Sequence, residues 1–177
     1  MRRKWTLPLL SISVIIVCCV TLAVMWILPY LTSVDPAEQQ AALFALDHTP
    51  MEHVLQVQIY TGGPTDLTVT GTNAFGRKLY AFVRQNSATI VYQSQTVSKQ
   101  KAEAVVYGLH ARIASIVSAV PGLVDRHSIA PVSQHASGNA VWEITARLRD
   151  GGFLFAYVDM YTGKLLTSFQ TNNAPTL

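Results

Sequence analysis

One hairpin pattern occurs twice in this chain, and its second copy is the more complete. Residues 140–169 read as three strands joined by two tight turns, because apolar and polar residues alternate on both sides of Asp150-Gly151-Gly152. Residues 76–83 align without a gap with residues 151–158, and Leu, Ala and Val recur at the same positions of the strand. Self-similarity of this kind predicts a duplicated structural unit.

The first copy is preceded by a helix and an additional strand. Asp35 and Pro36 followed by Glu38 form a helix-start pattern, so we expect a helix over residues 36–47 and a strand over residues 51–60. Period-two alternation turns one set of apolar side chains of that strand toward the core. That set is Leu55, Val57 and Ile59.

The second copy is preceded by a longer helical pattern. Apolar residues recur every three or four positions over residues 98–120, which predicts one helix that ends at Pro121. Gly108 inside this pattern indicates close packing of the helix on a sheet. A further strand is expected over residues 123–129. A helix followed by an antiparallel meander, present twice, predicts an α+β fold.

The N-terminal region reads as a membrane anchor. Residues 5–31 contain no charged residue, and their apolar core has the length of about twenty residues that a transmembrane helix needs. Residues 1–4 carry three basic side chains, so by the positive-inside rule they are expected in the cytoplasm and the rest of the chain outside the cell membrane. A cleaved signal peptide is the alternative, but no clear small-residue cleavage site follows the segment.

Charge and cysteine content limit the possible functions of the exterior part. Three of the 13 Lys and Arg residues flank the anchor, so 10 remain against 10 Asp and Glu, and the exterior part is formally neutral. This balance gives no support for nucleic-acid binding. Cys18 and Cys19 both lie in the anchor, so the exterior part is stabilised without disulfides.

No pattern of catalytic, cofactor-binding or metal-ligating residues is recognisable. The five His residues show no paired spacing on a predicted helix and have no neighbouring Cys. Glu143 is expected on the polar face of its strand, and Asp159 opens a turn whose backbone N–H groups its side chain can bind. We therefore expect a protein that is not an enzyme and has no cofactor.

One strand is apolar on both sides, which requires an explanation. Phe153, Phe155 and Tyr157 project from one side of it, and Leu154, Ala156 and Val158 project from the other. A strand covered by a helix on one side does not need a second apolar face. The aromatic side is therefore either buried against the other copy or available to bind a partner.

Motifs in both copies resemble the TseB-like cell wall elongation regulators of Gram-positive bacteria. The residues that carry the resemblance are Gly71-Thr72, Gly76, Leu79-Tyr80, Val83, Trp142-Glu143, Thr145, Tyr157-Val158-Asp159, Thr162-Gly163-Lys164 and Leu166. The resemblance implies two tandem PepSY-type, cystatin-like units behind an N-terminal anchor. On this basis we expect one unit over residues 35–95 and a second over residues 96–170. The polar tail over residues 171–177, which contains Pro175, is expected to be disordered.

The resemblance also implies a function. Proteins of this family act by binding a penicillin-binding transpeptidase of the elongation machinery, which implies a membrane-anchored regulator here. Because cystatin-like units can also shield a protease, a membrane-anchored, protease-inhibitor-like or protease-regulating module is the alternative. Such a module needs an uncharged loop to present to a cleft, and residues 133–139 are the candidate.

Overall fold

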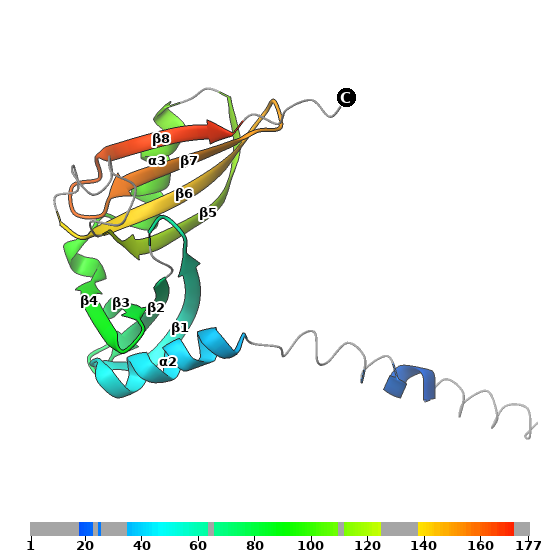
Figure 1. Cartoon of the computed structure of the whole chain (residues 1–177), viewed down its shortest axis with the longest axis vertical. Coiled ribbons are helices and arrows are strands. Elements are labelled where there is room, and N and C mark those ends of the chain that lie inside the picture. Colours follow the sequence, from blue (N-terminus) through cyan, green and yellow to red (C-terminus); the bar gives the residue numbers. More distant parts are fainter. Residues whose placement is uncertain are drawn as a thin grey trace, which may run out of the picture. The chain divides into compact units, whose positions relative to one another are not determined.

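The computed structural model of the chain describes residues 18–22, 25, 35–63, 66–109, 112–124 and 138–171 (Figure 1). Residues Ala37–Leu177 form one compact unit, and the residues through Pro36 form another. The elements from Pro36 onward are α2 (Pro36–His48), β1 (Met51–Tyr60), β2 (Asp66–Asn73), β3 (Lys78–Arg84), β4 (Ser87–Tyr92), the 3-10 turn η1 (Gln93–Gln95), α3 (Lys99–Leu109), β5 (Ile113–Leu123), β6 (Ala140–Leu148), β7 (Phe153–Asp159) and β8 (Leu165–Thr171).

These strands form two antiparallel four-stranded sheets, each a simple meander. The strand orders are β1-β2-β3-β4 and β5-β6-β7-β8. In the first sheet, the small side chains of Ala41 and Ala45 let α2 pack on an apolar face that includes Val69 and Leu79. In the second, Ala102 and Val106 of α3 pack against the core (Figure 1). The expected α+β class is confirmed.

Part of the expected organisation lies outside the described residues. Only residues 18–22 and 25 of the expected anchor (residues 5–31) are described, and they are helical. No helix within the described ranges combines the length and the hydropathy that crossing a membrane requires. The basic flank at residues 1–4 and residues 172–177 of the expected tail are also outside them. Thr171, predicted to begin that tail, is instead the last residue of strand β8. The expected division between residues 95 and 96 falls between the two sheets, and the assignment of two units stays a prediction.

The long second helix predicted over residues 98–120 is wrong. Helix α3 ends at Leu109, and Ile113–Leu123 is strand β5. The register of β5 against β6 shifts twice, between Ile113 and Ser115 and between Ile116 and Ser118. Each shift inserts one unpaired residue, so the strand turns inward every third residue instead of every second. The residues that face inward are Ile113, Ile116 and Ala119, opposite Leu148, Ala146 and Ile144.

Two related expectations change with this element. Pro121, predicted to end the helix, lies inside β5, and of the strand expected over residues 123–129 only residues 123 and 124 are described, with Leu123 the last residue of β5. Gly108 was predicted to mark close helix packing, but a Cβ atom there would meet no atom within 4 Å. The glycine therefore faces open space.

Strand β1 contains the same two bulges. Its register against β2 shifts between Met51 and His53 and again between Val54 and Gln56. As a result, the residues that contribute to the core are Met51, Val54 and Val57. The predicted facing is therefore right for Val57 but wrong for Leu55 and Ile59, which are 60% and 45% exposed. A pair of bulges at equivalent places in both sheets supports a structural repeat.

The turns of the two hairpins follow the sequence pattern. Gly76 and Gly151 occupy equivalent positions and both have positive φ angles, of 69° and 89°, which glycine adopts without strain. In the turn between β7 and β8, the Asp159 carboxylate accepts hydrogen bonds from the backbone N–H groups of Tyr161 (2.8 Å) and Thr162 (2.7 Å). The structural role predicted for Asp159 is thereby confirmed.

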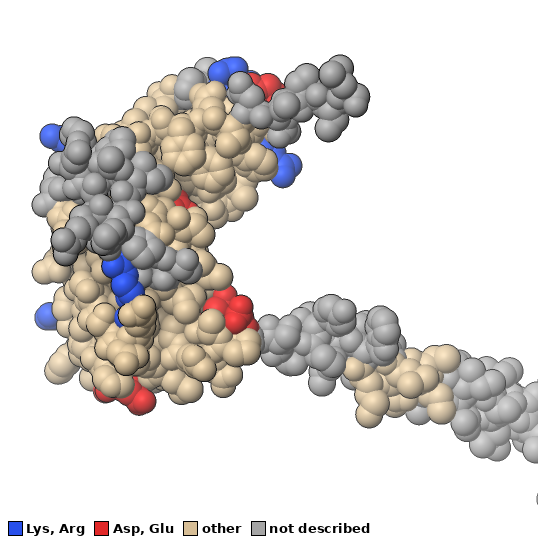
Figure 2. Space-filling view, viewed as in Figure 1, with Lys and Arg blue, Asp and Glu red and all other residues tan. Residues whose placement is uncertain are grey.

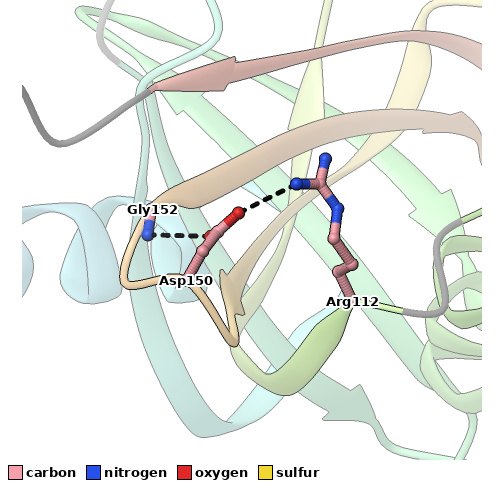
Figure 3. Close-up of polar contacts among 3 residues, drawn as sticks. All are labelled: Arg112, Asp150 and Gly152. Carbon is pink, nitrogen blue, oxygen red and sulfur yellow. Dashed lines mark hydrogen bonds and ion pairs between the residues drawn. The ribbon is translucent and has the colours of Figure 1, made fainter.

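The turn between β6 and β7 carries an exposed ion pair (Figure 3). Arg112 Nη1 lies 3.0 Å from Asp150 Oδ2, and the Gly152 N–H donates a hydrogen bond to Asp150 Oδ1 at 3.4 Å.

We expect Asp150→Ala to lower the free energy of unfolding by less than about 1 kcal/mol, because water screens exposed pairs. Asp159→Ala, which removes a buried acceptor, should lower it by about 1–3 kcal/mol. Equal losses in urea denaturation would contradict this prediction.

Candidate functional site

The two sheets share a packed core at the place where they meet. Tyr80 and Phe82 of β3 belong to the same apolar cluster as Trp142 of β6. The rings of Tyr80 and Trp142 meet edge to face, with centroids 5.8 Å apart and an interplanar angle of 88°. Burial raises the pKa of Tyr80 to about 12, so its hydroxyl group is neutral at physiological pH. The apolar core of the second half therefore extends onto the face of the first sheet opposite α2.

A buried carboxylate lies at the same junction. Glu143 is only 7% exposed, which corrects its predicted place on a polar, solvent-facing side of the strand. Its side chain accepts hydrogen bonds from the hydroxyl groups of Thr61 (2.9 Å) and Tyr157 (3.0 Å). Burial raises the pKa of Tyr157 well above its usual range, and the negative charge and hydrogen bond of Glu143 raise it further.

Two glycines allow this close approach. A Cβ atom at Gly122 of β5 would overlap the ring of Tyr60, and one at Gly62 would overlap Tyr157 and lie 2.7 Å from Glu143 Oε2. The Thr68 hydroxyl also donates a buried 2.6 Å hydrogen bond to the Pro121 carbonyl. The sequence around Gly62 gives no sign of this role, because nothing local shows which distant element approaches a glycine.

The three predicted partner-binding residues lie along one face of β7 with different environments. Tyr157 is 3% exposed and packs with Tyr60 of the first sheet. Phe155 and Phe153 are half-buried. Of the two interpretations made from sequence, burial against the other copy therefore describes Tyr157. Phe153 and Phe155 lie farther from that contact, and their role in binding stays a prediction.

A third phenylalanine, which sequence reasoning did not single out, completes this face. Phe169 of β8 pairs with Phe155 across the ladder, and their rings stack with centroids 5.2 Å apart. Phe169 is 42% exposed. The Arg147 guanidinium lies 5.7 Å from the centroid of the Phe153 ring, within cation–π range. Phe153, Phe155 and Phe169 are called the aromatic face below.

The part of the chain that the structure describes offers no obvious metal centre. No group of three or more His, Cys, Asp or Glu side chains within it is placed to hold a metal ion. Glu143 and Asp159, the two carboxylates considered from sequence, are both engaged in hydrogen bonds of the kinds given above. Fold and surface together define a class: a two-sheet α+β protein with half-exposed aromatic rings, the residue type enriched at protein interfaces.

Comparison with known proteins shows what this chain is similar to. The cell wall elongation regulator TseB-like domain matches residues 40–84. The probable cell wall elongation regulator TseB of Bacillus subtilis (strain 168) is 28% identical over 133 residues, which cover 75% of this chain and 76% of the relative. A solved structure, the YpmB protein from Bacillus subtilis, matches with a TM-score of 0.60 at 23% identity and shows the shared fold over 78% of this chain and 100% of that chain.

The resemblance expected from the motifs is confirmed, because the family model, the curated relative and the solved structure all support a TseB-like family. The match at residues 40–84 runs from α2 to the end of β3 and includes the first-copy motifs Gly71-Thr72 and Leu79-Tyr80. The family is named for a regulator, which is compatible with the expectation that the chain is not an enzyme.

Proposed function

We propose that this chain regulates cell wall elongation by binding a penicillin-binding transpeptidase through its aromatic face, on the outer side of the cell membrane. The observation that carries the proposal is the stack of Phe155 on the 42%-exposed Phe169, beside the half-buried Phe153. Aromatic rings presented in this way supply much of the binding energy at protein interfaces. The relationship to a regulator of cell wall elongation supports a partner in wall synthesis.

The proposal includes the location and the unit type. Residues 5–31 form a single-pass anchor in the lipid bilayer, and residues 1–4 stay in the cytoplasm, as their charge pattern predicts. The two halves are PepSY-type, cystatin-like units. An anchored chain of this kind acts at the same membrane as the synthases that build the wall.

Apolar burial is the main source of affinity in this proposal. Figure 2 shows Lys, Arg, Asp and Glu side chains only at scattered places on the face that it draws. With a formally neutral exterior part, long-range charge attraction contributes little. Aromatic side chains can bury about 150–250 Å² each. Because Phe155 is half-buried and Phe169 is 42% exposed, only part of that area is still available to a partner. Removing it from water contributes about 25 cal/mol per Å², so the two rings together are worth about 2–4 kcal/mol.

The test is crosslinking in the native membrane, with the full-length chain as bait. Phe155→Ser combined with Phe169→Ser is expected to reduce the recovered transpeptidase at least tenfold, while the thermal midpoint changes little. Phe75→Ser is the matched control, because Phe75 is 86% exposed on a turn of the first sheet. Replacing residues 5–31 with an unrelated anchor should preserve capture.

Three results would contradict the proposal. They are undiminished capture by the Phe155/Phe169 double variant, an equal loss in the Phe75 variant, and a collapse of the thermal midpoint in the double variant. The last result would show that the rings act in folding. Recovery of a protease in place of a transpeptidase would favour the alternative of a protease-regulating module.

A further inference from the structure

A polar cleft lies where the first sheet meets the second, on the opposite side of the first sheet from α2. Its volume is about 310 Å³, within the range of small-ligand sites. Its lining comes from strands β1, β2 and β3, from the segment that joins η1 to α3, and from strands β5 and β6. The lining includes Gln56, Thr70, Lys78, Tyr80, Gln93 and Lys99.

Amide and hydroxyl groups dominate this lining. In the first sheet, Thr70 of β2 lies opposite Gln56 of β1 on one side and Tyr80 of β3 on the other, so the three side chains form one row across the strands. Within the described residues, the side chains of this row make no hydrogen bond, and neither do those of Gln58 and Gln93. These groups supply both donors and acceptors that are not committed to the fold.

The charge of the cleft has one sign. Lys78 and Lys99 line it, and no Asp or Glu is among the described residues that do. A neighbouring hollow is lined by Arg77, Lys78, Gln93 and Ser94, which extends the basic edge. Lys99 has one acidic neighbour, Glu103, at 3.9 Å on the exposed side of α3. The combined surface therefore favours an anionic ligand.

Hydrogen bonds to the second sheet fix one wall of the cleft. The Val97 N–H donates to the Met160 carbonyl at 2.7 Å, and Trp142 Nε1 donates to the Val97 carbonyl at 3.2 Å. The Ser98 hydroxyl accepts a bond from the Lys101 N–H at 3.2 Å, which caps the start of α3. A wall held at both sides loses little conformational entropy when a ligand binds.

We propose that this cleft binds a hydroxyl-rich anionic chain of the cell wall. The amides and hydroxyls would pair with ligand hydroxyl groups, and Lys78 and Lys99 with a phosphate or carboxylate. Apolar peptide side chains fit less well, because the two aromatic rings of the lining, Tyr80 and Trp142, are only 6% and 2% exposed and offer little apolar surface. The inference rests on the extracytoplasmic location in the proposed function and adds a second ligand to it.

The test is calorimetry on the full-length chain in detergent micelles with three defined probes. A glycerol phosphate oligomer and a muramic acid disaccharide carry the two kinds of anion, and chitotetraose is a neutral saccharide. We expect at least one anionic probe to bind at least tenfold more tightly than chitotetraose. The probe that binds more tightly distinguishes a polyol phosphate polymer from a peptidoglycan strand.

Matched variants locate the site. Lys78→Ala combined with Lys99→Ala is expected to lower the affinity of the chain for the anionic probe at least tenfold. The control, Arg149→Ala combined with Lys164→Ala, removes the same charge from exposed positions that do not line the cleft and should change affinity less than twofold. Gln56→Ala combined with Gln93→Ala should weaken binding without changing net charge.

The outcomes separate this inference from the proposed function. Absence of binding by both anionic probes, equal binding of chitotetraose, or equal losses in the two charge variants would overturn it. The Phe155/Phe169 double variant should bind the probe normally, and the Lys78/Lys99 variant should still capture the transpeptidase. Failure of transpeptidase capture by every form of the chain would leave the probe result intact.

Discussion

Replacing Gly122 with valine is expected to lower the free energy of unfolding by about 3 kcal/mol or more. A Cβ atom at this position would overlap three atoms of the Tyr60 ring, close to where the ring joins its own backbone. Tyr60 is completely buried between the sheets, so the ring cannot swing away. Overpacking of this kind displaces backbone. Urea denaturation of the full-length chain measures the loss.

A second glycine provides the control for this prediction. Gly108 lies in α3 with open space where a Cβ would be, so Gly108→Ala should raise stability by about 0.5–1 kcal/mol through helix propensity. Tyr60→Ala in the Gly122→Val background should restore part of the loss, because the two side chains compete for one space. A Gly122→Val chain as stable as the original would show that the sheets can separate freely.

Replacing Glu143 with alanine is expected to lower the free energy of unfolding by about 2–4 kcal/mol. The substitution removes the acceptor for two hydroxyl groups, those of Tyr157 and Thr61, and leaves the buried Tyr157 hydroxyl without this partner. Leaving a buried donor without its acceptor lowers the free energy of unfolding by about 1–3 kcal/mol, and by more when the acceptor is charged. Glu143→Gln, which keeps an oxygen at this place, should lose only about half as much.

A double-mutant cycle tests whether the hydrogen bond itself carries this effect. Tyr157→Phe removes only the hydroxyl group. The drop in the free energy of unfolding that it causes should be at least about 1 kcal/mol smaller in the Glu143→Ala background than in the original chain. Additive losses would show that Glu143 acts through packing. A stability curve for Glu143→Ala within about 0.5 kcal/mol of the original would contradict the prediction.

The hairpins were predictable because their signals are local. Glycines at Gly76 and Gly151 mark turns with positive φ, and period-two alternation marks β6 and β7. The helix predicted over residues 36–47 agrees with α2 (Pro36–His48) to within one residue at the C-terminal end. Each of these features depends on a few consecutive residues, so a single sequence is sufficient to place them.

Strand β5 was missed for a specific physical reason. Apolar residues at Ile113, Ile116 and Ala119 have the three-residue spacing of a helix, but two bulges give a strand the same spacing. Strand β1 of the first copy has the same two bulges, so the core-facing apolar residues of both strands depart from simple alternation. Pairing with a neighbouring strand decides the matter, and pairing is not visible in one segment.

The aromatic face was predictable only in part. Alternation along β7 places Phe153, Phe155 and Tyr157 on one side of the sheet, as expected. The approach of Tyr60 decides that Tyr157 is buried, and the register of β8 decides that Phe169 stacks on Phe155. Both depend on residues that are distant in the chain.

The sequence by itself determined the repeated hairpin pattern, the α+β class, the hairpin turns and the resemblance to the TseB-like proteins, because these follow from short patterns and recurring motifs. Only the tertiary structure decided which residues the bulged strands turn inward, that Glu143 is buried with two hydroxyl donors, and where the polar cleft lies. The physical reason is that strand register and burial are set by contacts between residues that are distant in the chain. A residue's own neighbours in the chain carry no information about those contacts.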